Sequence, residues 1–142
     1  MGKQRPRFST VNGFVKTYTQ AKTLNYETLV KHEYMSKYDK MFFSTNSQLG
    51  VKIVAYFSIP KSHYRYHKKT NTTDLDKIGQ QMKDGFIMPT KKPDTDNIAK
   101  LVLDSLNGIA YPDDAQVVCL EVHKLYDENP RVEMEIYEIW EL

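Results

Sequence analysis

Regular patterns of apolar residues divide the chain into strands and helices. Residues 50–60, GVKIVAYFSIP, alternate with a period of two and end at a proline, which predicts a β-strand. Residues 23–43 repeat apolar side chains at near-helical spacing, which predicts a long amphipathic helix. A shorter helix is expected over residues 74–83, with Gly85 placed to end it. Two prolines in FIMPTKKP then predict a loop.

Turn residues predict further strands near both ends of the chain. Residues 7–19, RFSTVNGFVKTYT, favour a β-hairpin, because Asn12 and Gly13 tolerate the positive φ angles of a tight type I′ turn. The last stretch, VVCLEVHKLYDENPRVEMEIYEIWEL, predicts two strands joined by turn residues 127–130. We therefore expect an α+β fold: a single two-layer domain over residues 1–142, with a mixed or antiparallel sheet packed against helices.

Composition excludes several classes of protein. With 40% apolar and 12% aromatic residues, the chain is not a disordered tail. No run of about 18 apolar residues occurs, so no membrane span is expected. The N-terminus lacks the apolar middle of a secretion signal, which predicts a cytoplasmic protein. Cys119 is the only cysteine, which excludes an internal disulfide, and its apolar neighbours predict a buried side chain.

Charge is distributed unevenly along the chain. Residues 1–92 contain 17 Lys and Arg against 6 Asp and Glu, a net charge of +11. Residues 93–142 contain 3 against 12, a net charge of −9. A basic stretch beside an acidic centre suits a nucleic acid, whose backbone is held by cations while the acids hold metal ions. Alternatively, the two halves attract each other or a partner subunit.

The acidic half begins with the segment KPDTDNIAKLVLDSLNGIAYPDDAQVV. Asp94 is placed to cap the N-terminus of a short helix, and Asp96 falls in the first turn, where carboxylates favour the helix dipole. The apolar residues of this helix share one face, while Asp96, Lys100 and Asp104 form a stripe on the opposite face. One interpretation of that stripe is a solvated face with a ladder of ion pairs.

A metal site is the second interpretation of these acids. After the helix, Asp113 and Asp114 form another acidic turn. If the chain returns Asp114 to the side of Asp94 and Asp96, three carboxylates converge, and such an oxygen-only site selects Mg²⁺ or Mn²⁺.

Two other kinds of metal site are excluded by spacing. A calcium-binding EF-hand loop that began at Asp94 would place Ile98 and Ser105 at two of its ligand positions. The four histidines form no convincing zinc set, and His63 and His67 lie in a basic aromatic stretch that suits solvent or phosphate better.

The whole acidic segment resembles the central motif of the RusA family of Holliday-junction resolvases, which occur in phages and prophages. The motif has Asp-x-Asp-Asn, a Lys four residues after the second Asp, Asp-x-Leu, and an aromatic-x-Asp-Asp-x-Gln-Val stretch. Similarity to phage-type members extends to KQRPRF and TYTQAKTLNYETLV near the start. The residues that match the motif are Asp94, Asp96, Asn97, Lys100, Asp104, Leu106, Tyr111, Asp113, Asp114, Gln116 and Val117.

The resemblance implies a homodimeric, Mg²⁺-dependent endonuclease that cuts four-way DNA junctions symmetrically during recombination and repair. The family's essential carboxylates, which hold the metal, fall on Asp94, Asp96 and Asp114, and its functional lysine falls on Lys100. We expect Mn²⁺ to substitute for Mg²⁺, and Asp113 to cap the turn or to bind metal through water. The basic candidates for DNA contacts, each of which could instead be an ordinary surface charge, are Arg5, Arg7, Arg65, Lys68, Lys69, Lys91 and Lys92.

Family members usually have a β-strand before KQRPR, whereas this chain opens at Met1. Either the start is truncated or the sheet is one strand shorter, with an exposed edge.

Symmetry predicts a C2 dimer, because two equivalent strands must be cut. The C-terminal strand is apolar on both faces, so one face is either the dimer interface or covered by a helix. The apolar residues are Val132, Met134, Ile136 and Trp140 on one face and Tyr137 and Ile139 on the other.

Two other functions remain open from the sequence. The protein could bind DNA without cutting it, with a structural acidic cluster, or it could be a Mg²⁺-dependent enzyme for another phosphate substrate. Convergence of Asp94, Asp96 and Asp114 on a point about 2.1 Å from each carboxylate would favour the enzymes.

Overall fold

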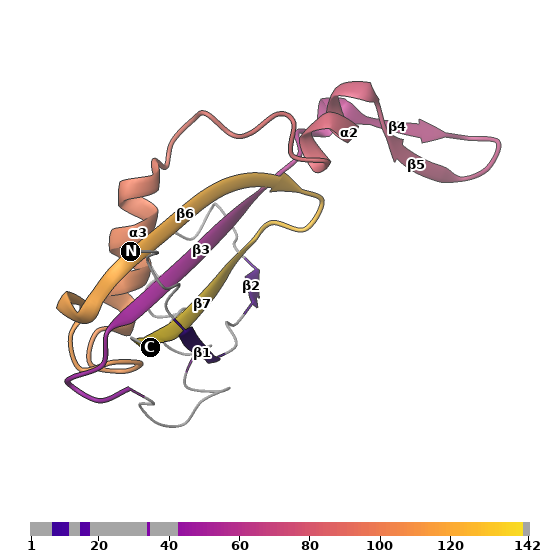
Figure 1. Cartoon of the computed structure of the whole chain (residues 1–142). Coiled ribbons are helices and arrows are strands. Elements are labelled where there is room, and N and C mark those ends of the chain that lie inside the picture. Colours follow the sequence, from indigo (N-terminus) through magenta and orange to yellow (C-terminus); the bar gives the residue numbers. More distant parts are fainter. Residues whose placement is uncertain (1–6, 12–14, 18–33, 35–42, 141–142) are drawn as a thin grey trace, which may run out of the picture.

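A five-stranded mixed sheet forms the centre of the computed structural model, which describes residues 7–11, 15–17, 34 and 43–140 (Figure 1). The strand order is β1-β7-β3-β6, and β2 also pairs with β7. β3 runs parallel to β6 and antiparallel to β7, so the predicted α+β class and mixed sheet are confirmed. The strands are β1 (Arg7–Val11), β2 (Val15–Thr17), β3 (Leu49–Ser58), β6 (Val117–Asp127) and β7 (Arg131–Trp140).

Helix α3 (Thr95–Leu106) packs against one face of this sheet (Figure 1). The apolar side chains expected to share one helix face, among them Ile98 and Val102, are buried against Val51 and Ile53 of β3. β7 adds Val132, Met134 and Ile136 to the same core. Across the described ranges, no helix is long and apolar enough to cross a membrane.

The predicted N-terminal hairpin is wrong. Strands β1 and β2 exist, but both pair antiparallel with β7 and therefore run in the same direction. Val11 of β1 lies opposite Ile136 of β7, and Val15 of β2 lies opposite Glu133. The pairing of β2 with β7 is therefore offset by one residue from the pairing of β1 with β7. The ten-residue β7 offers a long row of backbone partners, and this tertiary pairing overrides the local turn preference of Asn12 and Gly13, which lie outside the described residues.

The two C-terminal strands form where predicted, but they are not neighbours. β3 lies between β6 and β7, so residues 128–130 cross the end of a strand instead of closing a hairpin. The middle position suits β3 because Leu49, Val51, Ile53 and Ala55 are all buried. A strand with so much buried apolar surface is favoured between two partners.

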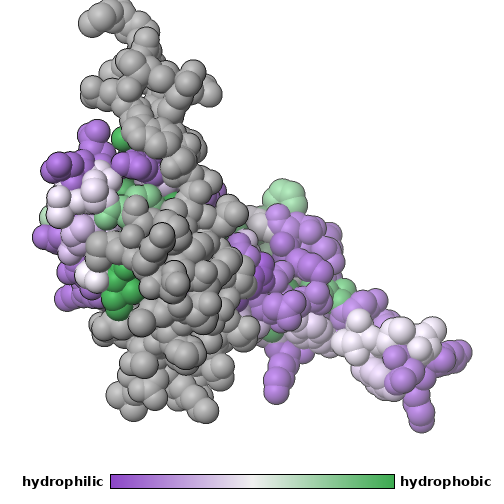
Figure 2. All heavy atoms as spheres, turned by 90° about the horizontal axis from the view of Figure 1, so that it is seen from below, coloured by the Kyte–Doolittle hydropathy of each residue, from purple (hydrophilic) through white to green (hydrophobic). Residues whose placement is uncertain are grey.

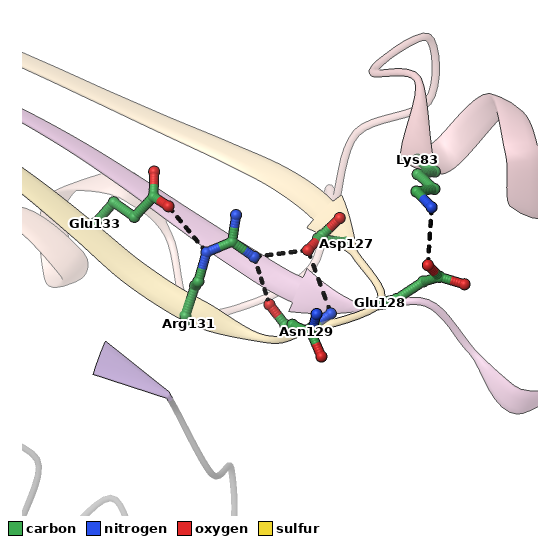
Figure 3. Close-up of polar contacts among 6 residues, drawn as sticks. All are labelled: Lys83, Asp127, Glu128, Asn129, Arg131 and Glu133. Atoms are coloured by element: carbon green, nitrogen blue, oxygen red, sulfur yellow. Dashed lines mark hydrogen bonds and ion pairs between the residues drawn. The ribbon is translucent and has the colours of Figure 1, made fainter. Parts of the chain in front are cut away.

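Arg131 holds this crossing together (Figure 3). Its Nη1 donates to Asp127 Oδ2 at 2.6 Å and to the Asn129 carbonyl at 2.8 Å, while Nε donates to Glu133 at 2.9 Å. The guanidinium also lies 3.9 Å from the ring centroid of Tyr56 on β3. Burial alone would raise the pKa of Asp127, but the hydrogen bonds from Arg131 and from backbone amides outweigh it and lower the pKa. The loop between β6 and β7 is thus fixed to both strands and to β3.

A second, two-stranded sheet projects from the first (Figure 1). It consists of β4 (Tyr64–His67) and β5 (Thr72–Leu75), preceded by the 3-10 turn Lys61–His63 and followed by helix α2 (Lys77–Lys83).

The predicted start of the helix at residue 74 is wrong, because residues 74 and 75 belong to β5. Asp76 instead caps α2 by accepting from the Gly79 amide at 2.7 Å. Gly85, with φ +85°, follows the helix as expected.

The helix expected over residues 23–43 lies outside the described residues, except that Tyr34 is helical and buried in the core and that Phe43 is buried.

The prediction that Cys119 is buried is wrong: β6 is the last strand in the order, and the Cys119 side chain is exposed. Apolar neighbours in sequence do not bury a residue when its strand is at the edge of a sheet.

We predict that Arg131→Met lowers the free energy of unfolding by about 2 kcal/mol, because two hydrogen bonds to half-buried carboxylates and one to the Asn129 carbonyl are lost together. Urea denaturation followed by circular dichroism measures the change. Lys83→Met is the matched control, since it removes only the more exposed ion pair with Glu128 and should change the free energy by less than about 1 kcal/mol. Equal effects of the two variants would contradict the role assigned to Arg131.

Candidate active site

The N-terminus of α3 presents two of the predicted acids. Asp94 caps the helix, with Oδ1 accepting from the Asn97 amide at 2.9 Å, as the sequence predicted. Asp96 lies in the first turn, and both side chains are exposed. Two carboxylates are therefore held at one end of the helix with access to solvent.

Lys100 lies in the middle of the exposed face of α3. Asp96 and Asp104 flank it at a spacing of four residues, and all three side chains are exposed. In the described part of the chain, no ion pair joins Lys100 to either aspartate. The ladder of ion pairs considered from the sequence therefore does not form, and the Lys100 side chain is exposed.

The acidic turn after α3 is built by a network of local hydrogen bonds. Asn107 Oδ1 accepts from the Asp114 amide at 3.2 Å, which ties the turn to the end of the helix. Asp113 and Gln116 form a capping box around the 3-10 turn Asp114–Gln116. Gln116 also donates to the Ser44 carbonyl at 2.6 Å. Asp113 thus caps the turn, which is one of the two roles expected for it.

Asp114 is half-buried and lies close to other acids. Burial raises its pKa, and so do a side-chain hydrogen bond with Asp113 and the negative charges of Asp113 and Asp104. Beneath it, Tyr111 is fully buried and donates to the Leu103 carbonyl at 2.8 Å. Burial, followed by the charges of Asp114 and Asp104, raises the pKa of Tyr111 as well. The carboxylates of Asp104, Asp113 and Asp114 repel one another here, and a bound cation would stabilise them.

The predicted acids occupy two ends of one helix. Asp94 and Asp96 lie at the start of α3, whereas Asp114 lies beside Asp104 and Asn107 near its end, and a helix of 12 residues is about 18 Å long. Within the described ranges, no three His, Cys, Asp or Glu residues are grouped so that they could hold a metal ion. The oxygen donors suit Mg²⁺ chemically, but one chain does not bring Asp94, Asp96 and Asp114 into a ready-made group.

The loop from α2 to α3 carries Lys91 and Lys92 three and two residues before Asp94. Both lysines are exposed. The Lys91 carbonyl accepts from Lys124 Nζ of β6 at 2.5 Å, and the Lys124 ammonium lies 5.6 Å from the ring centroid of Phe57. One side chain of the sheet thus anchors the loop three residues before the helix cap.

Three other basic candidates lie on the projecting sheet, whose surface is largely hydrophilic (Figure 2). Arg65 is exposed opposite Asp74, and Lys68 and Lys69 are exposed between the two strands. Arg7 belongs to β1 and pairs with Trp140, while Arg5 lies outside the described residues. The structure therefore separates the basic candidates into a projecting group and a loop group next to the helix cap.

Two neighbours of the site were not predicted. Asp104 was assigned to a solvated stripe, although its charge acts on Asp114; its match to the motif was the available signal. Lys124 had no signal, because it lies 33 residues from Lys91 in sequence and only the return of β6 beside β3 brings them together.

Comparisons with known proteins agree over nearly the whole length. A family model described as Endodeoxyribonuclease RusA matches residues 1–137. A Bacillus subtilis (strain 168) protein named Uncharacterized protein YqaN is 36% identical over 135 residues, covering 95% of this chain and 87% of the relative. A Lactococcus phage r1t protein named Crossover junction endodeoxyribonuclease rusA is 28% identical over 138 residues, covering 96% of this chain and 88% of that protein.

We predict that Lys124→Met, which keeps an apolar stem beside Phe57 but removes the donor, speeds amide hydrogen exchange in residues 86–93 several-fold. Lys124→Arg keeps a donor and should restore protection. Lys52→Met, at an exposed lysine of β3, is the control and should leave exchange in the loop unchanged. Unchanged exchange in Lys124→Met would show that the contact does not order the loop.

Proposed function

The chain belongs to the RusA family of endodeoxyribonucleases, and from this premise we propose that it is a Mg²⁺-dependent nuclease that resolves four-way DNA junctions. The observation that carries the proposal is the match of the family over residues 1–137, together with a phage relative whose name states crossover-junction cleavage. The corresponding role is in DNA recombination and repair, in the cytoplasm of a bacterium that carries the gene itself or in a prophage.

The acids at the two ends of α3 are the proposed metal ligands. We assign this role to Asp94 and Asp96 at its start and to Asp114 near its end, although the described residues of one chain do not bring them to a single point. Asp113 is secondary because its carboxylate already caps the turn. When bound, Mg²⁺ neutralises the anionic phosphate and lowers the pKa of an attacking water. Burial, a hydrogen bond with Asp113 and the charges of Asp113 and Asp104 together raise the pKa of Asp114; the charge repulsion among them supports this assignment, since a cation would relieve it.

Lys100 is the proposed partner of the reacting phosphate. Its amine makes no ion pair with a described residue and projects from the face of α3 between two aspartates. A lysine in that position can stabilise the charge that develops on the phosphate oxygens, or it can orient the water.

Two basic groups are proposed to position the DNA. Lys91 and Lys92 lie on the anchored loop next to Asp94, where a backbone phosphate held by them would be close to the site. Arg65, Lys68 and Lys69 lie on the projecting sheet and would contact a more distant part of the junction. A homodimer would supply one such set for each of the two strands that are cut.

The proposal is tested by incubating the protein with a synthetic four-way junction, and separately with linear duplex of the same sequence, with and without Mg²⁺. We expect paired, symmetric cuts in the junction, dependence on Mg²⁺, and little cutting of the duplex. Tight binding of the junction without cleavage in Mg²⁺ or Mn²⁺ would favour the non-catalytic DNA-binding alternative instead.

We predict that Asp94→Asn, Asp96→Asn and Asp114→Asn each abolish junction cleavage while leaving junction binding equal or tighter, because removing a negative charge eases the approach of DNA. Single-turnover cleavage and gel-shift assays measure the two effects. Asp84→Asn, at an exposed aspartate after α2, is the control and should cleave normally. Near-normal cleavage by any one of the three variants would remove that residue from the ligand set.

We predict that Lys91→Ala with Lys92→Ala lowers the salt dependence of junction affinity, with the slope of log affinity against log salt reduced by about 1 to 2. Lys68→Ala with Lys69→Ala is the matched pair on the projecting sheet. Binding titrations from low to moderate salt measure both slopes. If neither pair changes the slope, the DNA-binding surface lies elsewhere.

A further inference from the structure

Strand β6 ends the sheet with a long unpaired edge. Its residues Val117–Asp127, except Val118, pair with β3 on one side, and in the described part of the chain no strand pairs with the other side. The backbone N–H and C=O groups of alternate residues point to this free side and have no strand partner there among the described residues. Such an edge is a template for another strand.

The side chains along this edge are unusually apolar for their exposure. Val118 is 62% exposed and Leu120 is 42% exposed, and Cys119 between them is also exposed. Natural edge strands are usually protected by charges, proline or a covering element, and residues 117–122 contain one charge, Glu121, and no proline. Val118 has no partner on β3 and forms a β-bulge, which protects the edge from another strand only locally.

We propose that the β6 edge binds the β6 edge of a second copy of this chain, so that the two sheets continue across the dimer. The inference rests on the proposal that the protein acts as a homodimer and names the surface that joins the copies. Two identical edge strands that pair across a two-fold axis are antiparallel. The residue numbers of any two facing residues then add up to the same total.

Charge selects the register of this pairing. Glu121 and His123 are exposed on the same face of β6, two residues apart, and His123 Nε2 lies 3.4 Å from Glu121 Oε2, a contact that is an ion pair when His123 is protonated. An axis through Val122 places Glu121 opposite His123 of the other copy, twice, with Val122 facing itself. Moving the axis by one residue places either Glu121 or His123 opposite its own copy, which is unfavourable when both carry charge.

The same register covers the exposed apolar residues. With the axis at Val122, Leu120 faces the aliphatic stem of Lys124, and Cys119 faces Leu125.

One of the two β7 faces considered from the sequence is already occupied within one chain. Val132, Met134 and Ile136 of β7 are already buried in the core of one chain. On the other face of β7, the Tyr137 ring lies over Gly50 so closely that a Cβ added to that glycine would clash with it.

A pair of complementary variants tests the surface in the full chain. In Glu121→Lys, the introduced lysine would face His123 across the axis; in His123→Glu, the introduced glutamate would face Glu121. Each variant alone should dimerise about tenfold more weakly than the wild type, whereas a mixture of the two should form heterodimers, because every cross-axis pair is then of opposite charge. Mixing leaves the contacts within each chain unchanged, so recovery reports the interface alone.

Analytical ultracentrifugation at several protein concentrations measures the dimer constants, with thermal melting to check folding. Leu120→Lys should also weaken the dimer, while Ile78→Lys, at a similarly exposed apolar residue on α2, should not. Single variants that dimerise normally, or a mixture that does not recover, would overturn the β6 surface. Failure of this surface would leave junction cleavage by the wild type intact, whereas failure of the proposed function would abolish it.

Discussion

The insertion of β3 between β6 and β7 is the constraint on which the rest of the structure depends. Because β6 is parallel to β3, the chain must travel back along the sheet before β6 begins, and α3 with the loop before it makes that journey. The short crossing from β6 to β7 is then possible only over the end of β3, where Arg131 bonds to Asp127, to Glu133 and to the Asn129 carbonyl, and stacks on Tyr56. A half-buried guanidinium with several fixed acceptors suits this task because its donors have a rigid planar geometry.

This order of strands also positions the candidate active site. β6 begins at the acidic turn near the end of α3 and returns toward the start of the helix, where Lys124 reaches the Lys91 carbonyl. The strand therefore connects Asp114 at one end of the acidic segment with the loop before Asp94 at the other. The acids of one chain lie along this path and, among the described residues, do not meet at a single point.

Local features of the site were the most predictable from sequence. The cap at Asp94, the apolar face that includes Ile98 and Val102, and the turn at Asp113 depend on residues within a few positions of each other, so local backbone preferences decide them. The hairpin at Asn12 and Gly13 was predicted by the same kind of rule and is wrong, because β1 and β2 both find a longer partner in β7. Local preference for a turn is worth less than pairing two strands with a third.

By itself, the sequence determined the kinds of element, the acidic segment with its motif, and through that motif the family. These follow from periodicity and from the fixed spacing of side chains along one helix and one turn. Only the tertiary structure decided which strands are neighbours, that Cys119 is exposed at an edge, and that Lys124 anchors the loop beside Asp94. The physical reason is that strand pairing joins residues far apart in the chain, and its free energy depends on all the competing partners in the sheet, which no local pattern records.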